Sequence, residues 1–387
     1  MKKLLCNNRN NNGKAGEKIG IYIHIPFCAA KCKYCDFNSH VGGRTEQKEY
    51  VSVLCREITA FGKKHAKLSA DSIYFGGGTP TVLPCGDLIR ILDTIKSVFD
   101  VDKACEITTE CNPGTVDKAY LNELRCVGFN RLSIGIQSAN NALLRMLGRI
   151  HKFDDCRECV KAAKSAGFDN ISGDLMFGLP AQGMYVWRET LKAATELGLN
   201  HISAYALKIE EGTPFAKKGV SAADDDTSRE MYDLCVDYLA DMGYERYEIS
   251  NFAKSGFENR HNLKYWRCVD FIGFGAGAYS CFDGKRFSDI ADTAQYIKAV
   301  SEEKTVENTE VLSDFDKMSE FVYLGLRIRD GISESEFLRR FSTPIDEVFG
   351  EELNKNIKRG TLVREDERIY IPSRYVYVSN AIMSDFV

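Results

Sequence analysis

The chain has 387 residues, enough to bury a large core and to form roughly two or three domains. Its 44% hydrophobic and 27% charged residues are typical of globular proteins and exclude collagen-like, disordered and membrane-spanning classes. Lys and Arg total 51 against 55 Asp and Glu, and the net charge of −4 argues against nucleic-acid binding through bulk positive charge.

The first 18 residues are predicted to be a disordered tail, because this Asn-, Gly- and Lys-rich stretch offers almost nothing to bury. The apolar run after Met1 ends at Cys6, too early for a secretory signal peptide. No later stretch approaches the ~18 apolar residues of a membrane span. We therefore expect a cytoplasmic protein whose 14 cysteines stay reduced and are more often metal ligands or catalytic groups than disulfides.

From residue 19 the chain alternates short apolar strands with segments of helical periodicity. Strands are predicted at 19–25, 72–75, 106–110, 131–137, 171–179 and 201–209, and helices at about 45–62, 86–99, 117–127, 140–166, 184–198 and 226–242. Such alternation gives parallel strands with right-handed helical crossovers. No Gly-x-Gly-x-x-Gly follows the first strand, so an α/β barrel over 19–245, complete or partial, is favoured over a Rossmann sheet.

The alternation stops after residue 245. Residues 246–311 are predicted to close the barrel and to include a Gly-rich strand at 271–280. Near residue 312 the composition changes again, and helices at 314–329 and 334–341 precede a charged hairpin at 360–371. This order predicts a small C-terminal domain over 312–387, either winged-helix-like or a simple helical cap.

Three cysteines follow the first strand in the segment Cys28-Ala-Ala-Lys-Cys32-Lys-Tyr-Cys35. Three thiolates on one tight loop can bind three irons of a [4Fe–4S] cluster and leave the fourth iron open to a small ligand. A zinc site would need a fourth protein ligand, which no neighbouring C-x2-C or H-x3-H supplies. The spacing therefore favours an iron–sulfur cluster over zinc.

This loop and the preceding Tyr22-Ile-His-Ile-Pro-Phe resemble the radical S-adenosylmethionine (SAM) superfamily. Within it the chain is similar to the branch that holds oxygen-independent coproporphyrinogen III oxidase and the haem chaperone family HemW. The resemblance extends over about 19–380 and implies a partial (β/α)6 TIM-like barrel with the cluster at its mouth, where the C-terminal ends of the strands carry the functional residues. It also implies SAM as a cofactor, which a reduced cluster could cleave to a 5′-deoxyadenosyl radical.

Polar residues at successive strand ends are where the resemblance places SAM. The implied contacts are Tyr22, Tyr34, Gly77, Gly78, Thr79, Glu110, Gln137, Arg149 and Asp174. The glycine triplet and Thr79 would hold the amino group, Glu110 the ribose hydroxyls and Arg149 the carboxylate. For the glycines the alternative is a tight strand-to-helix turn. For the polar side chains it is mutual hydrogen bonding inside the barrel, because buried polar groups need partners.

Two features bear on which function the resemblance implies. The oxidase branch has a fourth cysteine two residues after the third, where this chain has Phe37, and a longer segment before the first strand. The chaperone motif H-N-x-x-Y-W is matched by His261-Asn-Leu-Lys-Tyr265-Trp266, which implies that His261 contacts a haem iron. For an arbitrary chain, the alternative is a histidine hydrogen-bonded in a loop beside a core tryptophan.

The favoured interpretation is therefore a haem chaperone that carries haem as cargo to acceptor proteins, such as respiratory enzymes of the membrane. The alternative is an oxidase that decarboxylates two propionates of coproporphyrinogen III to give protoporphyrinogen IX. Phe37 and the motif at 261–266 favour the chaperone.

Overall fold

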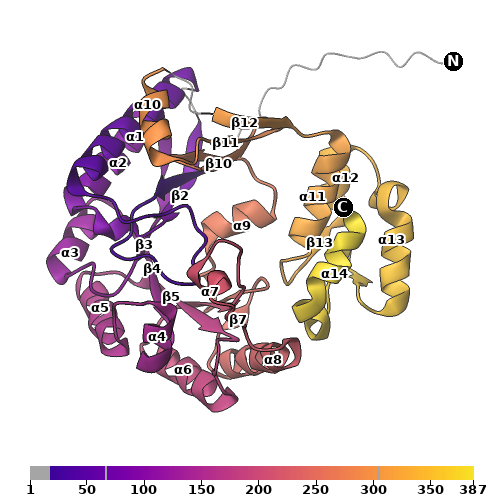
Figure 1. Cartoon of the computed structure of the whole chain (residues 1–387). Coiled ribbons are helices and arrows are strands. Elements are labelled where there is room, and N and C mark those ends of the chain that lie inside the picture. The colour runs from indigo at the N-terminus through magenta and orange to yellow at the C-terminus, as the bar shows by residue number, and fades with distance from the viewer. Residues whose placement is uncertain (1–17, 66–67, 303–305) are drawn as a thin grey trace.

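The computed structural model describes residues 18–65, 68–302 and 306–387. A strongly curved sheet is wrapped by helices, and a helical C-terminal region lies at its open side (Figure 1). Apart from Lys18, the tail predicted at 1–18 is outside the described residues. Within those three ranges, no helix has both the length and the apolar character needed to cross a membrane.

Six parallel strands form the core of the sheet and lie in chain order. They are β1 Ile19–Ile25, β2 Ser69–Gly77, β3 Asp100–Cys111, β4 Arg131–Gln137, β5 Asn170–Phe177 and β6 His201–Ala206. The crossovers carry α1 Arg44–Lys64, α2 Cys85–Val98, α3 Lys118–Cys126, α4 Asn141–Leu147, α5 Phe153–Ser165, α6 Met184–Glu196 and, after β6, α7 Pro214–Lys217 and α8 Asp225–Asp241. Every strand predicted for this region is present, which confirms the partial parallel barrel.

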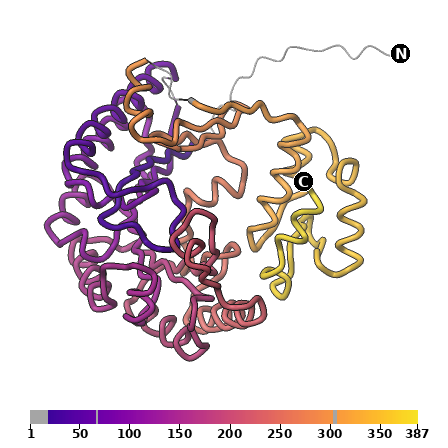
Figure 2. The backbone as a smooth tube through the Cα atoms, in the orientation of Figure 1, coloured from indigo at the N-terminus to yellow at the C-terminus, as the bar shows by residue number. Residues whose placement is uncertain are grey.

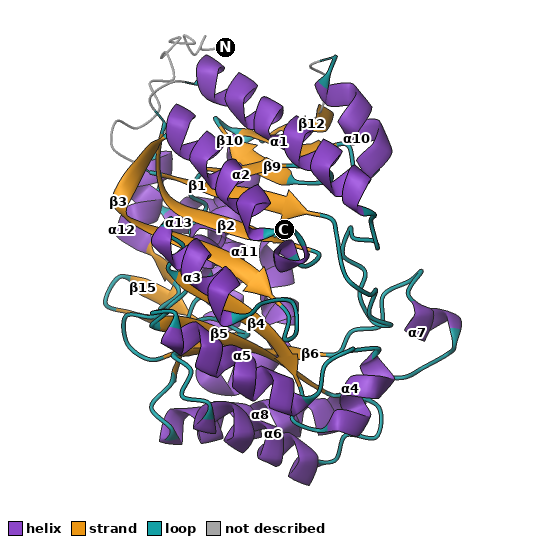
Figure 3. Ribbon diagram, turned by 90° about the vertical axis from the view of Figure 1, so that its left-hand side faces the viewer, coloured by secondary structure: helices purple, strands orange, loops and turns teal. Residues whose placement is uncertain are grey.

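Alternation along the strands separates an apolar outer face from a polar inner one. In β4 the outward residues Leu132, Ile134 and Ile136 are fully buried, whereas Arg131 and Ser133 point inward. Figure 3 shows the helices that cover the outer face of the strands. Side chains along a strand alternate with a period of two. Because the apolar side chains pack under the helices, the polar side chains point into the interior of the barrel.

The segment of helical periodicity predicted at about 140–166 forms two helices in the structure. Gly148 ends α4 in the left-handed conformation, with a φ of 81°, which favours glycine. A new helix, α5, then begins where the Asp155 carboxylate accepts a 2.7 Å hydrogen bond from the N–H of Lys152. Arg149 therefore lies in the connection between the two helices rather than on a helix surface.

Further strands extend both edges of the sheet. Beyond β6 lie antiparallel β8 Asn251–Ala253 and β7 Glu245–Arg246, and β9 Phe271–Phe274 pairs in parallel with β1. The Gly-rich strand predicted at 271–280 is interrupted, because Gly275 and Gly277 adopt φ values of 106° and 76° and turn the chain. It resumes as antiparallel β10 Tyr279–Phe282, followed by β11 Lys285–Asp289, α10 Thr293–Val300 and β12 Val306–Val311.

Helix α9 Arg260–Trp266 lies inside the curve of the sheet, where it packs against β2 and reaches Gly20 of β1 and Glu106 of β3. His261 approaches Gly20 so closely that a Cβ there would lie 3.2 Å from the imidazole. The N–H of Arg260 donates a 3.0 Å hydrogen bond to the buried carboxylate of Glu106. This helix therefore forms a floor inside the barrel, below the C-terminal ends of the strands.

The C-terminal region contains α11 Asp314–Gly325, α12 Glu334–Phe341, α13 Ile345–Arg359, α14 Ser379–Met383 and a small sheet of β13 Ile332–Ser333, β14 Val363–Glu365 and β15 Arg368–Tyr370. The hairpin turns through Asp366 and Glu367, both with positive φ, as a two-residue type I′ turn requires. Three of these helices, α11 to α13, precede the hairpin in the chain. Figure 2 shows this region beside the open side of the barrel, where the N–H of Arg329 donates to the Tyr247 carbonyl.

Candidate cluster and SAM site

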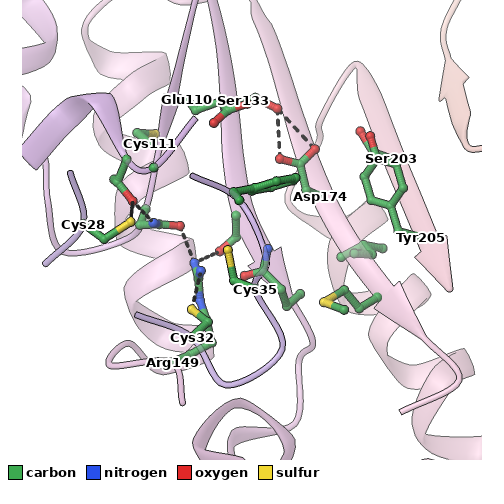
Figure 4. A pocket seen from close by; sticks show the side chains of 18 of the residues that line it. Cys28, Cys32, Cys35, Glu110, Cys111, Ser133, Arg149, Asp174, Ser203 and Tyr205 are labelled. Carbon is green, nitrogen blue, oxygen red and sulfur yellow. Dashed lines mark hydrogen bonds between the residues drawn. The ribbon is translucent and has the colours of Figure 1, made fainter. Parts of the chain in front are cut away.

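A cavity of about 290 Å³ opens at the C-terminal ends of the barrel strands. Ten of the residues predicted for the cluster and SAM line it: Cys28, Cys32, Tyr34, Cys35, Gly78, Thr79, Glu110, Gln137, Arg149 and Asp174. Figure 4 shows the cysteines and Arg149 on one side of this cavity and Asp174, Ser203 and Tyr205 on the other. Three predicted residues, Tyr22, Gly77 and His261, are not among those that line it.

The cysteine loop is held at its base by Phe27, which is fully buried and packs edge-on against Tyr50. Backbone hydrogen bonds close the loop, because the N–H of Cys28 donates to the His40 carbonyl at 2.9 Å and the N–H of His40 donates to Pro26 at 2.8 Å. The loop thus leaves and returns to the same point at the end of β1. This closure holds the three thiols over the mouth of the barrel.

The glycine triplet at the end of β2 is required by packing within the protein, whether or not a ligand is bound. A Cβ on Gly78 would lie 2.5 Å from the Phe27 carbonyl oxygen, and one on Gly77 would meet the His24 ring at 2.6 Å. The N–H of Thr79 then donates a 2.7 Å hydrogen bond to Phe27, which joins the two loops. Gly78 and Thr79 face the cavity as predicted, whereas Gly77 packs behind it.

A chain of hydrogen bonds links two of the three cysteines. The Thr79 hydroxyl donates to the Cys28 sulfur at 3.7 Å and accepts from the Asn112 amide at 2.7 Å. Arg149 donates to the side-chain oxygen Oδ1 of Asn112 and, at 3.6 Å, to the Cys32 sulfur. Its third contact is the Gly135 carbonyl at 2.8 Å. The Arg149 guanidinium is therefore fixed beside the loop with its charge facing the cavity, where a carboxylate could bind.

Two carboxylates face this charge across the cavity. The Tyr74 hydroxyl donates to Glu110 at 2.9 Å, and the Ser133 hydroxyl donates to Asp174 at 3.0 Å. Burial and the nearby Asp174 charge raise the pKa of Glu110 to about 7, and burial also raises the pKa of Asp174. Acceptors of this kind suit the paired hydroxyls of a ribose.

Two further groups in the cavity are unsatisfied. Gln137 has a left-handed φ of 60°, rare for a residue other than glycine, and its buried Oε1 has no hydrogen-bond partner. The guanidinium of Arg131 is fully buried, and its three nitrogens have no hydrogen-bond partner within the described residues, although its charge interacts with those of Glu110 and Asp174. Because buried polar groups are normally paired, these atoms fit a polar ligand such as SAM.

The cysteines fit a cluster rather than a single metal ion. All cysteines in the described residues are free thiols. Within those same residues, no group of three His, Cys, Asp or Glu side chains converges enough to hold one ion. Three thiols around one cavity instead suit a [4Fe–4S] cluster that takes one thiolate on each of three irons. A reduced cluster bound by Cys28, Cys32 and Cys35 would supply an electron to the SAM sulfonium.

Tyr22 and His261 lie deeper in the barrel than predicted. The Tyr22 hydroxyl is 3.1 Å from Nδ1 of His24, and its ring stacks on Tyr74. The His261 ring is 1% exposed, with Nδ1 3.0 Å from the Ser72 hydroxyl and Nε2 2.7 Å from the Tyr265 hydroxyl. Burial lowers the pKa of His261 to about 3, so its ring is neutral. In this conformation both ring nitrogens are engaged by hydroxyl groups of the barrel.

Sequence reasoning missed several residues that line the cavity, among them Asn112, Arg131, Ser203 and Tyr205. Ser203 and Tyr205 are two apart in β6, so their inward direction follows from the strand period. Arg131 and Ser133 show the same period in β4. Asn112 directly follows the end of β3, and its position after a strand was the only sequence signal available.

Comparison with known proteins agrees with this geometry. A family model described as the radical SAM superfamily matches residues 22–204, and one described as the HemN C-terminal domain matches residues 312–374. Among solved structures, the coproporphyrinogen III oxidase HemN of Escherichia coli, described as a radical SAM enzyme, has a TM-score of 0.85 at 22% identity and covers 96% of this chain and 90% of its own. This likeness shows a shared fold.

Curated relatives extend the similarity to nearly the whole chain. The haem chaperone HemW of Lactococcus lactis is 34% identical over 370 residues, which cover 95% of this chain and 96% of that protein. HemW of Bacillus subtilis is 32% identical over 372 residues, covering 95% and 98%. Identity at this level, over the cysteine loop, the barrel and the C-terminal region together, means that the chain belongs to the HemW family of haem chaperones within the radical SAM superfamily.

Proposed function

We propose that this protein is a haem chaperone, which binds haem as cargo and passes it to haem-requiring acceptor proteins, respiratory enzymes of the membrane among them. The observation that carries the proposal is the full-length similarity to the L. lactis haem chaperone, at 34% identity. A [4Fe–4S] cluster on Cys28, Cys32 and Cys35 and SAM in the adjoining cavity belong to the same proposal. Reduced thiols favour a cytoplasmic location.

Phe37 supports the chaperone over the oxidase. It stands where the oxidase branch has its fourth cysteine, and its side chain is 65% exposed at the rim of the cavity. Its carbonyl accepts a 2.5 Å hydrogen bond from Lys31, which also donates to Ser39. The position thus offers an apolar ring and no thiol.

One anaerobic experiment separates the two functions. The cluster-loaded protein is mixed with SAM, a reductant and coproporphyrinogen III, and porphyrin products are quantified. In parallel, haem is titrated into the protein, and transfer to an apo haem protein is followed by absorbance. We expect haem binding and transfer without decarboxylation. Stoichiometric protoporphyrinogen formation, or failure to bind haem, would overturn the proposal.

A further inference from the structure

A second hollow lies where the barrel floor meets the C-terminal region, and it shares no lining residue with the SAM cavity. We call it the α9–α12 groove, lined among others by Trp266, Arg267, Phe321, Ile332, Arg340 and Arg368. Its volume is about 490 Å³, within the range of roughly 300–1,000 Å³ typical of small-molecule sites. Its residues come from the end of α9, from α11 and α12, from β13 and the turn that precedes it, and from β15.

One wall of the groove is apolar and aromatic. Phe321 and Ile332 are 7% and 3% exposed, and Trp266 of the H-N-x-x-Y-W motif completes this wall. The guanidinium of Arg327 stacks 4.2 Å from the centre of the Trp266 ring. The indole N–H of Trp266 is buried and has no hydrogen-bond partner among the described residues. The apolar side chains of this wall can pack against a flat apolar ligand whose polar edge lies at the rim, and the indole N–H remains a donor that such a ligand could meet.

The rim of the groove is basic. Four arginines line it against two acidic side chains, Asp330 and Glu336. Arg340 and its neighbour Arg339 both hydrogen-bond Glu336, at 2.5 and 2.6 Å, so that carboxylate is already neutralised.

Two of these arginines remain open to a ligand. Arg267 and Arg368 are exposed, and within the described ranges their side chains form no hydrogen bond or ion pair. Open guanidinium groups above an apolar wall are complementary to a ligand that carries carboxylates on an apolar body.

We propose that haem docks in the α9–α12 groove, with its macrocycle on the Trp266–Phe321–Ile332 wall and its propionates on Arg267 and Arg368. This inference rests on the proposed haem-chaperone function and names the site of the cargo. None of the lining residues is His, Cys, Met or Tyr, the usual protein ligands of haem iron. Stacking and the propionates thus hold the haem, while His261 stays buried behind them and does not coordinate the iron.

The test titrates haem into the full-length protein and follows the Soret absorbance. The double variant Arg267→Glu/Arg368→Glu should weaken haem binding about 10-fold or more, because each substitution removes a charged hydrogen-bond donor and adds repulsion. The matched control is Arg56→Glu/Arg188→Glu, which makes the same charge change at exposed arginines outside both cavities and should bind as the wild type does. Metal-free protoporphyrin IX should compete with haem, because the iron is not held by a side chain.

Each other outcome of the titration would overturn a specific part of the proposal. Haem binding that is equal in the wild type and both double variants would reject the groove and leave the chaperone function standing. Absence of haem binding by the wild type would reject the chaperone function itself. Unchanged haem affinity with lost transfer in Arg267→Glu/Arg368→Glu would assign the groove to an acidic acceptor protein instead. Failure of protoporphyrin IX to compete would show that an iron ligand holds the haem.

Discussion

The cavity at the strand ends and the floor formed by α9 are two polar regions of one barrel interior, and they differ in how their hydrogen bonds are met. In the cavity, Gln137 Oε1 and the Arg131 guanidinium have no hydrogen-bond partner within the described residues. On the floor, at the start of α9, both nitrogens of His261 are engaged, and the Glu106 carboxylate accepts the N–H of Arg260.

This difference distinguishes the residues that bind a cofactor from the residues that stabilise the fold. An unpaired buried polar group costs free energy, so it persists where a ligand satisfies it when bound. A group already paired on every side contributes to stability and has nothing to offer a ligand. We therefore expect changes at the strand ends to affect cofactors and changes on the floor to affect folding, and five experiments test this division.

The largest effect is expected from Cys32→Ser. Removing one of three thiolates from the loop should abolish cluster loading, because hydroxyl oxygen is a poor ligand for iron in such clusters. Iron and sulfide are measured after anaerobic reconstitution, with thermal unfolding as a check on the fold. Cys126→Ser, an exposed thiol in α3, is the matched control and should load fully. Full loading of Cys32→Ser would reject the assignment.

On the floor, His261→Ala should lower the free energy of unfolding by about 2–4 kcal/mol, since it leaves a cavity and two unpaired hydroxyls. Tyr265→Phe removes one of those hydrogen bonds and should cost about 1 kcal/mol. Denaturant unfolding of both variants measures these losses, and SAM affinity should be unchanged. Wild-type stability with lost haem binding in His261→Ala would instead make this residue a haem ligand.

The lowered pKa of His261 also predicts that the stability of the protein depends on pH in acid. Its folded pKa of about 3 is below the value of about 6.5 in an unfolded chain, so the unfolded state takes up the proton first. The wild type should therefore lose stability as the pH falls below about 6.5, and His261→Ala should lose less over this interval. Urea unfolding at pH 7 and pH 5 compares the two proteins.

At the strand ends, Arg149→Met should weaken SAM binding by about 10- to 150-fold, because a charged hydrogen bond contributes about 1.5–3 kcal/mol. Isothermal titration with SAM on the cluster-loaded protein measures this change. Arg145→Met removes the same charge from the exposed surface of α4 and should leave the affinity unchanged. Equal affinities in the two variants would place the SAM carboxylate elsewhere.

The contrast between the two regions also explains what sequence could predict. Parallel strands and the inward direction of Glu110 and Asp174 follow from a period of two and from the rule that such strands end together. The helical apolar pattern continues through 140–166 and does not itself locate the break at Gly148, which one glycine and one cap decide. The position of Arg149 depends on that break.

The placement of the His261 motif was beyond sequence for a different reason. A histidine beside aromatic residues has the same pattern whether it faces a ligand or a strand. What decides is the approach of α9 to Gly20 and Ser72, residues distant in the chain. Asn112 was missed likewise, because its role depends on meeting Thr79 and Arg149 across two loops.

The smallest effect is expected at Glu110, where a change in melting temperature tests the electrostatics of the cavity. Its pKa of about 7 in the folded protein is above the unfolded value of about 4.5, so the folded state holds this proton longer. The ionised carboxylate therefore destabilises the ligand-free fold progressively as the pH rises from about 4.5 to 7. Glu110→Gln should raise the melting temperature by a few degrees more at pH 8 than at pH 5.

SAM binding should show the opposite dependence, because the carboxylate is the better acceptor for ribose hydroxyls. The wild-type affinity for SAM should rise several-fold between pH 6 and pH 8, and that of Glu110→Gln should stay level. Glu196→Gln, on the exposed surface of α6, should behave as the wild type in both measurements. A melting-temperature difference that does not change with pH would mean that Glu110 is ionised throughout, and that its contacts with Tyr74 and the strand ends outweigh the cost of its burial.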